Sequence, residues 1–530
     1  MSFSKRFWWV ALLVAWSFDF LFYGKPPGIS FLLWTIVALS AGLWLAKLEH
    51  VRPSRLSWVL VVAIVVTAFI SFLRLEEFTR FIGMAATLGL MILLAASFRT
   101  GDWLTYRISD YVVSFLRLLG NTFSLPSTLL RSNPSKVNEG EPEQTKNQSL
   151  KRAAPVLRGI LLALPVVAIL AALLASADPI FNDQLTNLLQ IFDIQHLPEN
   201  IFRLIYILIM AYLLTGIYLS AIASKTPEPL ADSSQPRVKP FLGMTETGII
   251  LASVNLLFGF FVVIQFRYFF GGQANIHAAG YTYSEYARKG FSELVIVSLL
   301  SLMLYLVLGA ITHRDNRTHQ HIFTTLNIFM IGFVLVILVS AFQRLRLYED
   351  AYGFSRLRTY THVFILFLGA LLVTTVLLEL FRQRRYFALA TLITVFAFTL
   401  SLAGLNVDAF VARQNIQRAV SGQELDAYYL GNLSYDALPA VLKIYQNETL
   451  PSDIHNLLGA ELACREFQMT DEKPLPWQGL NISTIVAKNL LQTQNQSWQE
   501  FTTRENPDHG IDVLVKGTYQ PCAKSWRENN

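Results

Sequence analysis

Residues 56–73 read LSWVLVVAIVVTAFISFL, an apolar stretch without a single charged side chain. A helix needs about 20 such residues to cross the hydrocarbon core of a bilayer. Similar runs recur between residues 7 and 405 and then stop; they lie at about 7–23, 28–46, 56–73, 79–98, 153–175, 200–223, 243–269, 290–311, 322–343, 359–381 and 385–405. We therefore predict an all-α fold, a polytopic transmembrane helix bundle of about 11 spans, followed by a small C-terminal domain.

The composition agrees with a membrane protein. Hydrophobic residues make up 53% of the chain and charged residues 15%, whereas charged residues are about 25% of an ordinary globular protein. The net charge of +6 is explained by the Lys and Arg that collect in cytoplasmic loops. The sequence contains no zinc finger, phosphate-binding glycine loop or long basic tract, so we predict no nucleic-acid partner and no cofactor.

Four segments follow from this pattern. Residues 1–98 are expected to form the N-terminal transmembrane helices, and 153–405 the main bundle. Between them, 99–152 is predicted to be a cytoplasmic amphipathic segment, with apolar residues at helical spacing over 103–130, and a polar, flexible linker. Residues 406–530 are predicted to form a small extracytoplasmic helical domain.

The orientation is predicted from the charges of the loops. The segment 176–199 holds four carboxylates and no Lys or Arg, whereas the alternate segments are rich in Lys and Arg. Basic residues are enriched on the cytoplasmic side. This places the N-terminus in the cytoplasm, and an odd number of spans places the C-terminal domain outside.

Two predicted outer loops break that charge rule, one with Arg267, Arg288 and Lys289, the other with four arginines between residues 344 and 358. One interpretation is that short loops tolerate Arg by pairing it with carboxylates and lipid phosphates. The other is a basic pocket for an anionic lipid or envelope polymer, since Arg binds phosphate or carboxylate through two hydrogen bonds. The hypothetical ligand-binding residues are Arg267, Arg288, Lys289, Glu293, Arg344, Arg346, Arg356 and Arg358.

The first of these loops contains further signals. Gly271 and Gly272 allow a sharp turn at the end of a helix. Glu293 shares a helical face with Lys289 and is expected inside the outer leaflet, where a carboxylate needs a cationic partner such as Arg267 or Lys289. A structural ion pair and a binding or proton-carrying carboxylate are the two alternatives.

Five ordered motifs carry a family resemblance: RYFFGG (267–272), YARKGFSEL (286–294), LYEDAYG (347–353), NVDAFVARQNIQR (406–418) and LDAYYLGNLSYDALP (425–439). Over about residues 240–445 the chain resembles a bacterial multi-pass membrane family that is defined only as a domain of unknown function, DUF 4173. The resemblance implies a bacterial plasma-membrane protein and little about its chemistry.

The C-terminal domain contains both cysteines of the chain, Cys464 and Cys522. An oxidising compartment outside the cell favours a disulfide between them; two unpaired core residues are the alternative. Three polar residues that follow the last span, Asp408, Asn415 and Arg418, are predicted to clamp the domain to the bundle rather than to catalyse.

Chemical motifs are scarce. The sequence has no nucleophile elbow and no HExxH, and three nearby histidines, His313, His319 and His321, lack the further ligands of a metal site. Our first hypothesis is a non-catalytic plasma-membrane protein that binds or senses an anionic envelope component. The second is an envelope enzyme or transporter for a lipid-linked anionic substrate, with Glu293 or Asp408 as acid or base. The third is a scaffold for a membrane-protein partner.

Overall fold

The computed structural model describes residues 3–131, 197–223, 240–270, 291–314, 316–447, 450–471, 475–506 and 510–522. It divides into two compact units, Met1–Asp19 with Thr122–Gly216, and Phe20–Asn121 with Ile217–Asn530.

Nine helices in the described ranges are long and apolar enough to cross a membrane. They are α2 (Ile29–Leu48), α3 (Arg55–Leu73), α4 (Glu77–Ser97), α8 (Leu197–Ala223), α9 (Met244–Phe270), α12 (Phe291–Ile311), α13 (Arg317–Tyr352), α14 (Arg356–Leu380) and α15 (Phe387–Leu405). The predicted all-α polytopic bundle is confirmed.

Two of the eleven expected spans are not among these nine. The first forms α1 (Phe3–Phe22), a helix that carries Lys5, Arg6 and Asp19. The expected span at 153–175 lies outside the described residues. Two further helical segments are α5 (Ile108–Arg131), in the predicted amphipathic segment, and the 3-10 turn η1 (Asp102–Leu104).

The first unit contains an ion pair with a buried carboxylate. Asp19 of α1 is 3% exposed and accepts a hydrogen bond from Nε of Arg203, on α8, at 2.9 Å. The hydroxyl of Tyr206, one turn further along α8, donates to the same carboxylate. A carboxylate in an apolar helix pair needs such partners because it has lost its water.

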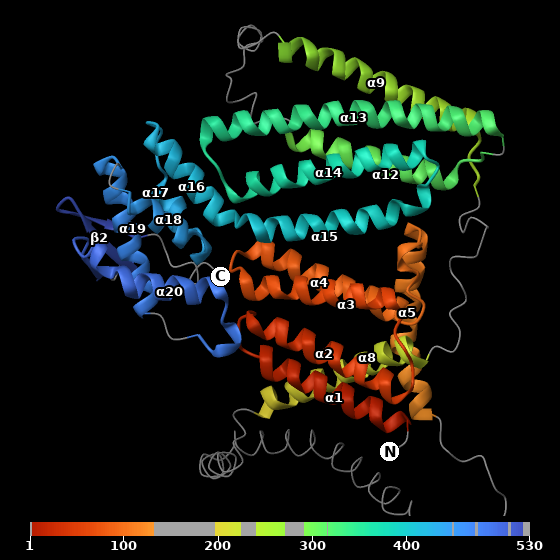
Figure 1. Ribbon diagram of the computed structural model, residues 1–530, viewed down its shortest axis with the longest axis horizontal. Helices are drawn as coiled ribbons and strands as arrows, with labels where there is room; N and C mark the ends of the chain where they lie inside the picture. The colour runs from red at the N-terminus through yellow and green to blue at the C-terminus, as the bar shows by residue number, and fades with distance from the viewer. Residues whose placement is uncertain are drawn as a thin grey trace, which may run out of the picture. The chain divides into compact units, whose positions relative to one another are not determined.

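In the second unit the spanning helices lie side by side (Figure 1). Helix α3 packs between α2 and α4, and α13 contacts α9, α12 and α14. Helix α15 contacts α14 and α4, so it joins the two groups. Small polar groups fill the close contacts: Thr87 donates to Thr67 across the α3–α4 pair at 2.9 Å, which suits helix packing in lipid.

Helix α13 is much longer than the predicted span at 322–343. Its 36 residues extend about 54 Å at 1.5 Å per residue, well beyond a hydrocarbon core of about 30 Å. Its last turns reach Tyr352, and α14 begins at Arg356 under a cap from Ser355, which accepts the N–H of Arg358 at 3.4 Å. The expected arginine-rich outer loop at 344–358 is therefore wrong in its extent, because only residues 353–355 lie outside a helix.

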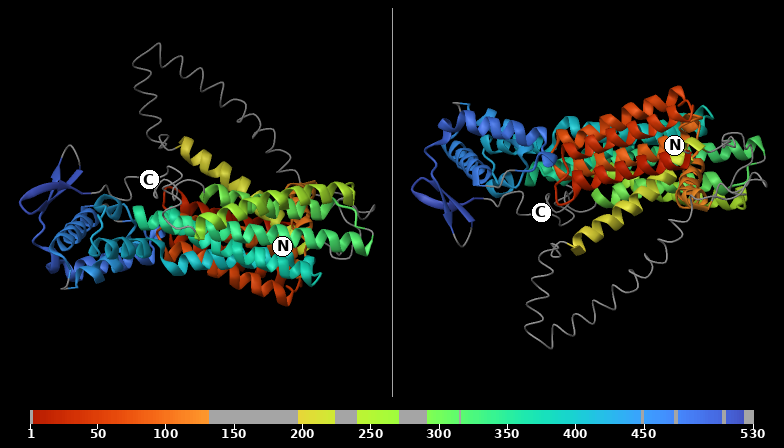
Figure 2. Two further views of the ribbon diagram at one scale, coloured as in Figure 1. Left: turned by 90° about the horizontal axis from the view of Figure 1, so that it is seen from above. Right: turned by 90° about the horizontal axis from the view of Figure 1, so that it is seen from below.

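The C-terminal domain lies beyond one end of the α2–α4 and α13–α15 helices (Figures 1 and 2). It contains α16 (Val407–Val420), α17 (Ala427–Gly431), α18 (Leu438–Tyr445), α19 (Ser452–Asp471) and α20 (Ile482–Gln494), with 3-10 turns η5 (Tyr435–Ala437), η6 (Trp477–Gly479) and η7 (Asn495–Trp498). A further 3-10 turn, η4 (Arg384–Tyr386), precedes α15.

A three-stranded antiparallel sheet ends the described chain, with strand order β1 (Thr503–Asn506), β2 (Gly510–Val515), β3 (Thr518–Pro521). The prediction of a purely helical domain missed this sheet. Val513 and Val515 of β2 alternate into the core, and the two-residue turn Lys516–Gly517 has positive φ at both positions, as a tight hairpin requires.

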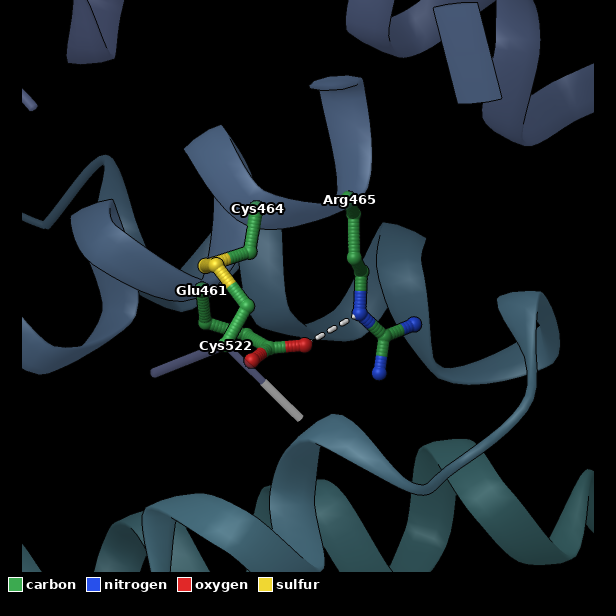
Figure 3. The surroundings of a disulfide bond; sticks show 4 residues. All are labelled: Glu461, Cys464, Arg465 and Cys522. Atoms are coloured by element: carbon green, nitrogen blue, oxygen red, sulfur yellow. Dashed lines mark hydrogen bonds and ion pairs between the residues drawn. A yellow bond between two sulfur atoms is a disulfide. The ribbon is translucent and has the colours of Figure 1, made fainter. Parts of the chain in front are cut away.

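A disulfide between Cys464 of α19 and Cys522 ties the end of β3 to the helical part of the domain. Their Cα atoms are 5.8 Å apart, an ordinary separation for a cystine. Beside it, Glu461 and Arg465 form a buried pair one turn apart on α19, as Figure 3 shows. Burial raises the pKa of Glu461, while Arg465 beside it acts in the opposite direction.

Candidate functional site

The first predicted ligand set can be placed only in part. Gly271, Gly272, Arg288 and Lys289 lie outside the described residues, as does the side chain of Arg267 at the end of α9. Glu293 lies in the first turn of α12, is exposed, and accepts a hydrogen bond from Ser292 at 2.9 Å. Its predicted partners are Arg267 and Lys289, so that pairing falls outside the described side chains.

Three of the four arginines in the second set contact groups of the chain itself. Arg344 donates to Gln265 of α9 at 3.1 Å. The guanidinium of Arg358 lies 4.0 Å from the ring centroid of Tyr348 and donates to the carbonyl of Tyr352 at 3.3 Å. Arg346 is exposed on α13.

Arg356 makes the most complete of these contacts. Its Nε and Nη2 donate to the two carboxylate oxygens of Asp408, on α16, at 2.6 and 2.7 Å. The Asp408 side chain is fully buried and also accepts the backbone N–H of Ser434 at 2.7 Å. The backbone N–H of Arg356 donates to the hydroxyl of Tyr429 at 2.9 Å, and burial raises the pKa of that tyrosine. The start of α14 is thereby bound directly to α16 and α17 of the C-terminal domain, and Asp408 extends the contact to Ser434.

Asp436 forms a second buried centre. Its side chain is fully buried and one oxygen accepts the backbone N–H groups of Leu75 and Glu76, in the α3–α4 loop, at 2.7 and 2.8 Å. The other oxygen accepts the hydroxyl of Ser483, at the start of α20, and lies 3.6 Å from Nη1 of Arg74. One carboxylate thus joins the loop between two spans to a helix of the domain.

The α3–α4 loop is itself fixed to other spans. Glu76 caps α4 by accepting the N–H groups of Phe78 and Thr79, each at 2.8 Å, and it accepts the hydroxyl of Tyr360 on α14. Arg74 donates through Nε to the carbonyl of Ala403, near the end of α15, at 2.8 Å. A capping carboxylate satisfies backbone donors that a helix start would otherwise leave unbonded.

The turn between α13 and α14 contacts α16. Asn415 accepts the backbone N–H of Phe354 at 2.7 Å and donates to the carbonyl of the same residue at 2.9 Å. Arg418 donates to the carbonyls of Glu349 and, at 2.7 Å, Asp350. Gly353 between them has φ of +79°, a left-handed conformation that favours glycine.

The start of α2 also contacts the domain. The N–H of Ile29 donates to the carbonyl of Leu480 at 2.9 Å. A Cβ atom on Gly28 would lie 2.5 Å from that carbonyl oxygen, so the backbones approach too closely for any side chain here.

We call this set the junction. It consists of the charged and polar side chains that join the domain to the ends of the spans: Arg74, Glu76, Arg356, Asp408, Asn415, Arg418, Asp436 and Ser483. Sequence reasoning selected Arg356, Asp408, Asn415 and Arg418 but missed the other four. The sequence signal for two of them was the short charged stretch at 74–77 between two predicted spans.

A carboxylate and an imidazole face each other near the junction. Nδ1 of His362, on α14, lies 3.1 Å from Oε1 of Glu349, on α13. The Glu349 side chain is 4% exposed, and the ring of Phe342 meets the imidazole edge-on, with centroids 4.6 Å apart. Nε2 of His362 is buried and has no hydrogen-bond partner among the described residues.

The described ranges contain no group of three or more His, Cys, Asp or Glu side chains arranged to hold a metal ion.

A family model named domain of unknown function DUF4153 matches residues 59–444, which is more than two thirds of the 530-residue chain. The chain belongs to the DUF4153 family. The expected family of unknown function is therefore correct in kind, but the number expected from the motifs, 4173, is replaced by 4153. No curated protein and no solved structure matches the chain.

The DUF4153 match runs from α3 into α18. It includes both buried carboxylates of the junction, Asp408 and Asp436, and the α3–α4 loop that Asp436 holds. Ser483, the disulfide and the sheet lie beyond it. The family region therefore covers the described spans from α3 onward together with the first helices of the domain, and not spans alone.

Proposed function

We propose that this DUF4153 protein is a non-catalytic protein of the bacterial plasma membrane. Its C-terminal domain lies outside the cell, where it binds or senses an anionic envelope component, and the junction transmits the state of the domain to the bundle. Contact with a bilayer follows from the spanning helices. The identity of the ligand, the type of membrane and the orientation of the chain in it are what we propose.

The charges at the two ends of the bundle support the orientation. Basic residues gather at the end remote from the domain, on the α2–α3, α12–α13 and α14–α15 connections and after α4: Lys47, Arg52, Arg55, Arg99, Arg314, Arg317, Arg382, Arg384 and Arg385. Such an end is typically cytoplasmic. The domain at the other end then faces an oxidising compartment, which suits its disulfide.

The bonding of Asp436 is the observation that carries the proposal. Its carboxylate holds two backbone N–H groups of the α3–α4 loop and the hydroxyl of Ser483 on α20. The domain cannot shift relative to this loop without breaking buried, charge-assisted hydrogen bonds, which are among the strongest in proteins. A movement of the domain therefore displaces the α3–α4 loop and with it the adjoining ends of α3 and α4.

The contacts of the outer arginines narrow the choice of ligand-binding residues. Arg344, Arg356 and Arg358 bond to the chain itself, so they support structure. Arg267, Arg288, Lys289 and Arg346 remain the proposed contacts to an anionic lipid or envelope polymer, and Glu293 remains a proposed member of the same site through its pairing with a cation.

A complementation experiment tests the coupling. In a deletion strain we expect an altered transcriptional response without accumulation of an envelope intermediate. Asp436→Asn should reach the membrane with its disulfide formed yet fail to restore the response, while Glu424→Gln, which changes an exposed carboxylate of the same domain, should restore it. Full restoration by Asp436→Asn would overturn the coupling. Arg346→Gln and Arg288→Gln test the ligand contacts separately.

The Glu349–His362 pair favours a second candidate, an envelope enzyme or transporter acting on a lipid-linked anionic substrate. When Nδ1–H of a neutral imidazole donates to a carboxylate, Nε2 is left able to accept a proton, as a general base must. Asp408 does not suit that role because Arg356 holds both its oxygens.

The pair can be tested directly. If this candidate holds, the deletion strain accumulates an envelope intermediate and His362→Gln fails to clear it, although the protein is present at the normal level. Normal clearance by His362→Gln rejects the pair as the reactive group. Purification with a tightly bound membrane protein and no intermediate would instead favour a scaffold.

A further inference from the structure

The end of the bundle remote from the domain contains a buried carboxylate with four bonds. Glu379, near the end of α14, is 1% exposed. It accepts the hydroxyls of Tyr305 and Thr324 at 2.9 and 2.7 Å and two hydrogen bonds from Arg384. Its charge is thus fully committed to one arginine and two hydroxyls.

A second arginine lies beside this pair. The guanidinium carbons of Arg314 and Arg384 are 4.3 and 5.3 Å from the ring centroid of Phe323, which is fully buried. Arg314 also donates to the carbonyl of Gly309. Two cations therefore share one aromatic ring, and Arg384 is the one of the two that bonds Glu379.

Three further arginines lie on the same two segments, at the start of α13 and in the α14–α15 turn. Nη2 of Arg382 lies 3.5 Å from Nε2 of His321 on α13, Arg317 lies one helical turn before His321, and Arg385 follows Arg384 in η4. All three arginines are exposed. The segments 312–321 and 379–386 contain five arginines against two carboxylates, Asp315 and Glu379, so this surface has an excess of positive charge.

The neighbouring apolar side chains fix the depth of the cluster. Leu380 ends α14 and Phe381 follows as its C-cap; they are 55% and 72% exposed. Ile322, next to His321, is 44% exposed. Exposed apolar side chains on a spanning helix contact acyl chains. The arginines that follow them directly therefore lie at the level of the lipid head groups.

We propose that this cluster binds the phosphate of an anionic phospholipid between the start of α13 and the α14–α15 turn. Arg317, Arg382 and Arg385 contact the phosphate. Arg314, and Arg384 that Glu379 holds, supply fixed positive charge beside it. Guanidinium groups suit this ligand because they donate two parallel hydrogen bonds to phosphate, and basic sites between helix ends recognise anionic head groups. The site is independent of the proposed role of the C-terminal domain.

Native mass spectrometry of the full-length protein tests the site. The protein is purified in detergent, and vesicle-derived phosphatidylglycerol or phosphatidylcholine is added back. We compare Arg382→Gln/Arg385→Gln with Arg52→Gln/Arg55→Gln, which removes the same charge from exposed positions of the α2–α3 connection. Melting temperatures of both variants verify that they are folded.

We expect the first variant to bind phosphatidylglycerol roughly thirty-fold more weakly, from the attraction of two basic side chains for an anionic surface. The control variant should bind it as the wild type does, and neither variant should change phosphatidylcholine binding. Equal losses of phosphatidylglycerol binding in both variants would show that general surface charge, and not a site, attracts the lipid. No loss in either variant would show that the arginines form no site. Each result overturns the proposal. Retention of an acidic protein in place of lipid would overturn it as well.

Discussion

Replacing Asp436 by Ala removes the acceptor that holds the α3–α4 loop to the C-terminal domain. The carboxylate is fully buried, and it accepts two backbone N–H groups and the hydroxyl of Ser483. Alanine offers none of these acceptors, and its methyl group is too small to fill the space of the carboxylate.

The size of the effect follows from these bonds. Each buried donor left without a partner costs about 1–3 kcal/mol. Two N–H groups are stranded, and the hydroxyl of Ser434, 3.1 Å from the carboxylate, also loses this acceptor. The hydroxyl of Ser483 can turn to the carbonyl of Leu73, 3.0 Å away. Arg74, with 17% of its side chain exposed, can turn to water. We therefore expect a loss of about 4 kcal/mol, concentrated at the junction. Asp436→Asn, which keeps one oxygen acceptor for the two N–H groups, should lose about half as much.

Hydrogen exchange measures this effect where it arises. In detergent or nanodiscs, the amides of Leu75 and Glu76 should exchange about a thousandfold faster in Asp436→Ala than in the wild type, if exchange follows local opening. Amides in the middle of α13 should keep their wild-type rates. Glu424→Ala, at an exposed position of the same domain, serves as the matched control.

One result would refute this reasoning. If Asp436→Ala leaves the exchange of Leu75 and Glu76 unchanged while the protein remains folded, water or another group satisfies these amides, and the carboxylate does not hold the loop. Equal acceleration in Glu424→Ala would show that the effect is not specific to the junction.

Three further predictions concern the domain and its attachment. Gly28→Ala should loosen the contact with Leu480 and raise the protease sensitivity of the domain, because a Cβ would lie 2.5 Å from the carbonyl oxygen; unchanged digestion would contradict this. Cys464→Ser should destabilise the domain by about 4 kcal/mol, since the cystine closes a separation of 58 residues; its melting temperature should fall and become insensitive to reductant. The pKa of Asp453 is lowered, first by its hydrogen bond from Lys516, so this small stabilisation is present above about pH 3.9 and fades as the pH falls below it. Lys516→Gln should remove that difference in a series of melting curves, with no effect at the lowest pH.

The spanning helices were predictable because each must satisfy its own backbone within an apolar segment, so the sequence of one span suffices to indicate it. The extent of α13 was not. Residues 344–352 include four charged side chains, a pattern that favours a loop, yet they are helical, and Arg418 bonds the carbonyls of Glu349 and Asp350. Those contacts come from α16, which no local pattern could indicate.

The junction illustrates the same limit. Asp408, Asn415 and Arg418 could be predicted as contacts between the domain and the bundle, because they are polar residues that closely follow the last predicted span. Asp436 was not predictable as a contact, because its partners at Leu75 and Glu76 lie 361 and 360 positions away in sequence. The sheet was missed because its strands are short and its turn, Lys516–Gly517, lacks the common Asn–Gly or Asp–Gly pair.

The bonds of Asp436 also set an order of events during biosynthesis. The N–H groups of Leu75 and Glu76 are made 361 and 360 residues before their acceptor, which at about 5–20 residues per second is a delay of roughly 20–70 seconds. Throughout that interval the α3–α4 loop lacks the acceptor for these two N–H groups. A chain released before residue 436 lacks the carboxylate that accepts the N–H groups of the α3–α4 loop. We expect membrane proteases to recognise such an incomplete product by this unbonded loop.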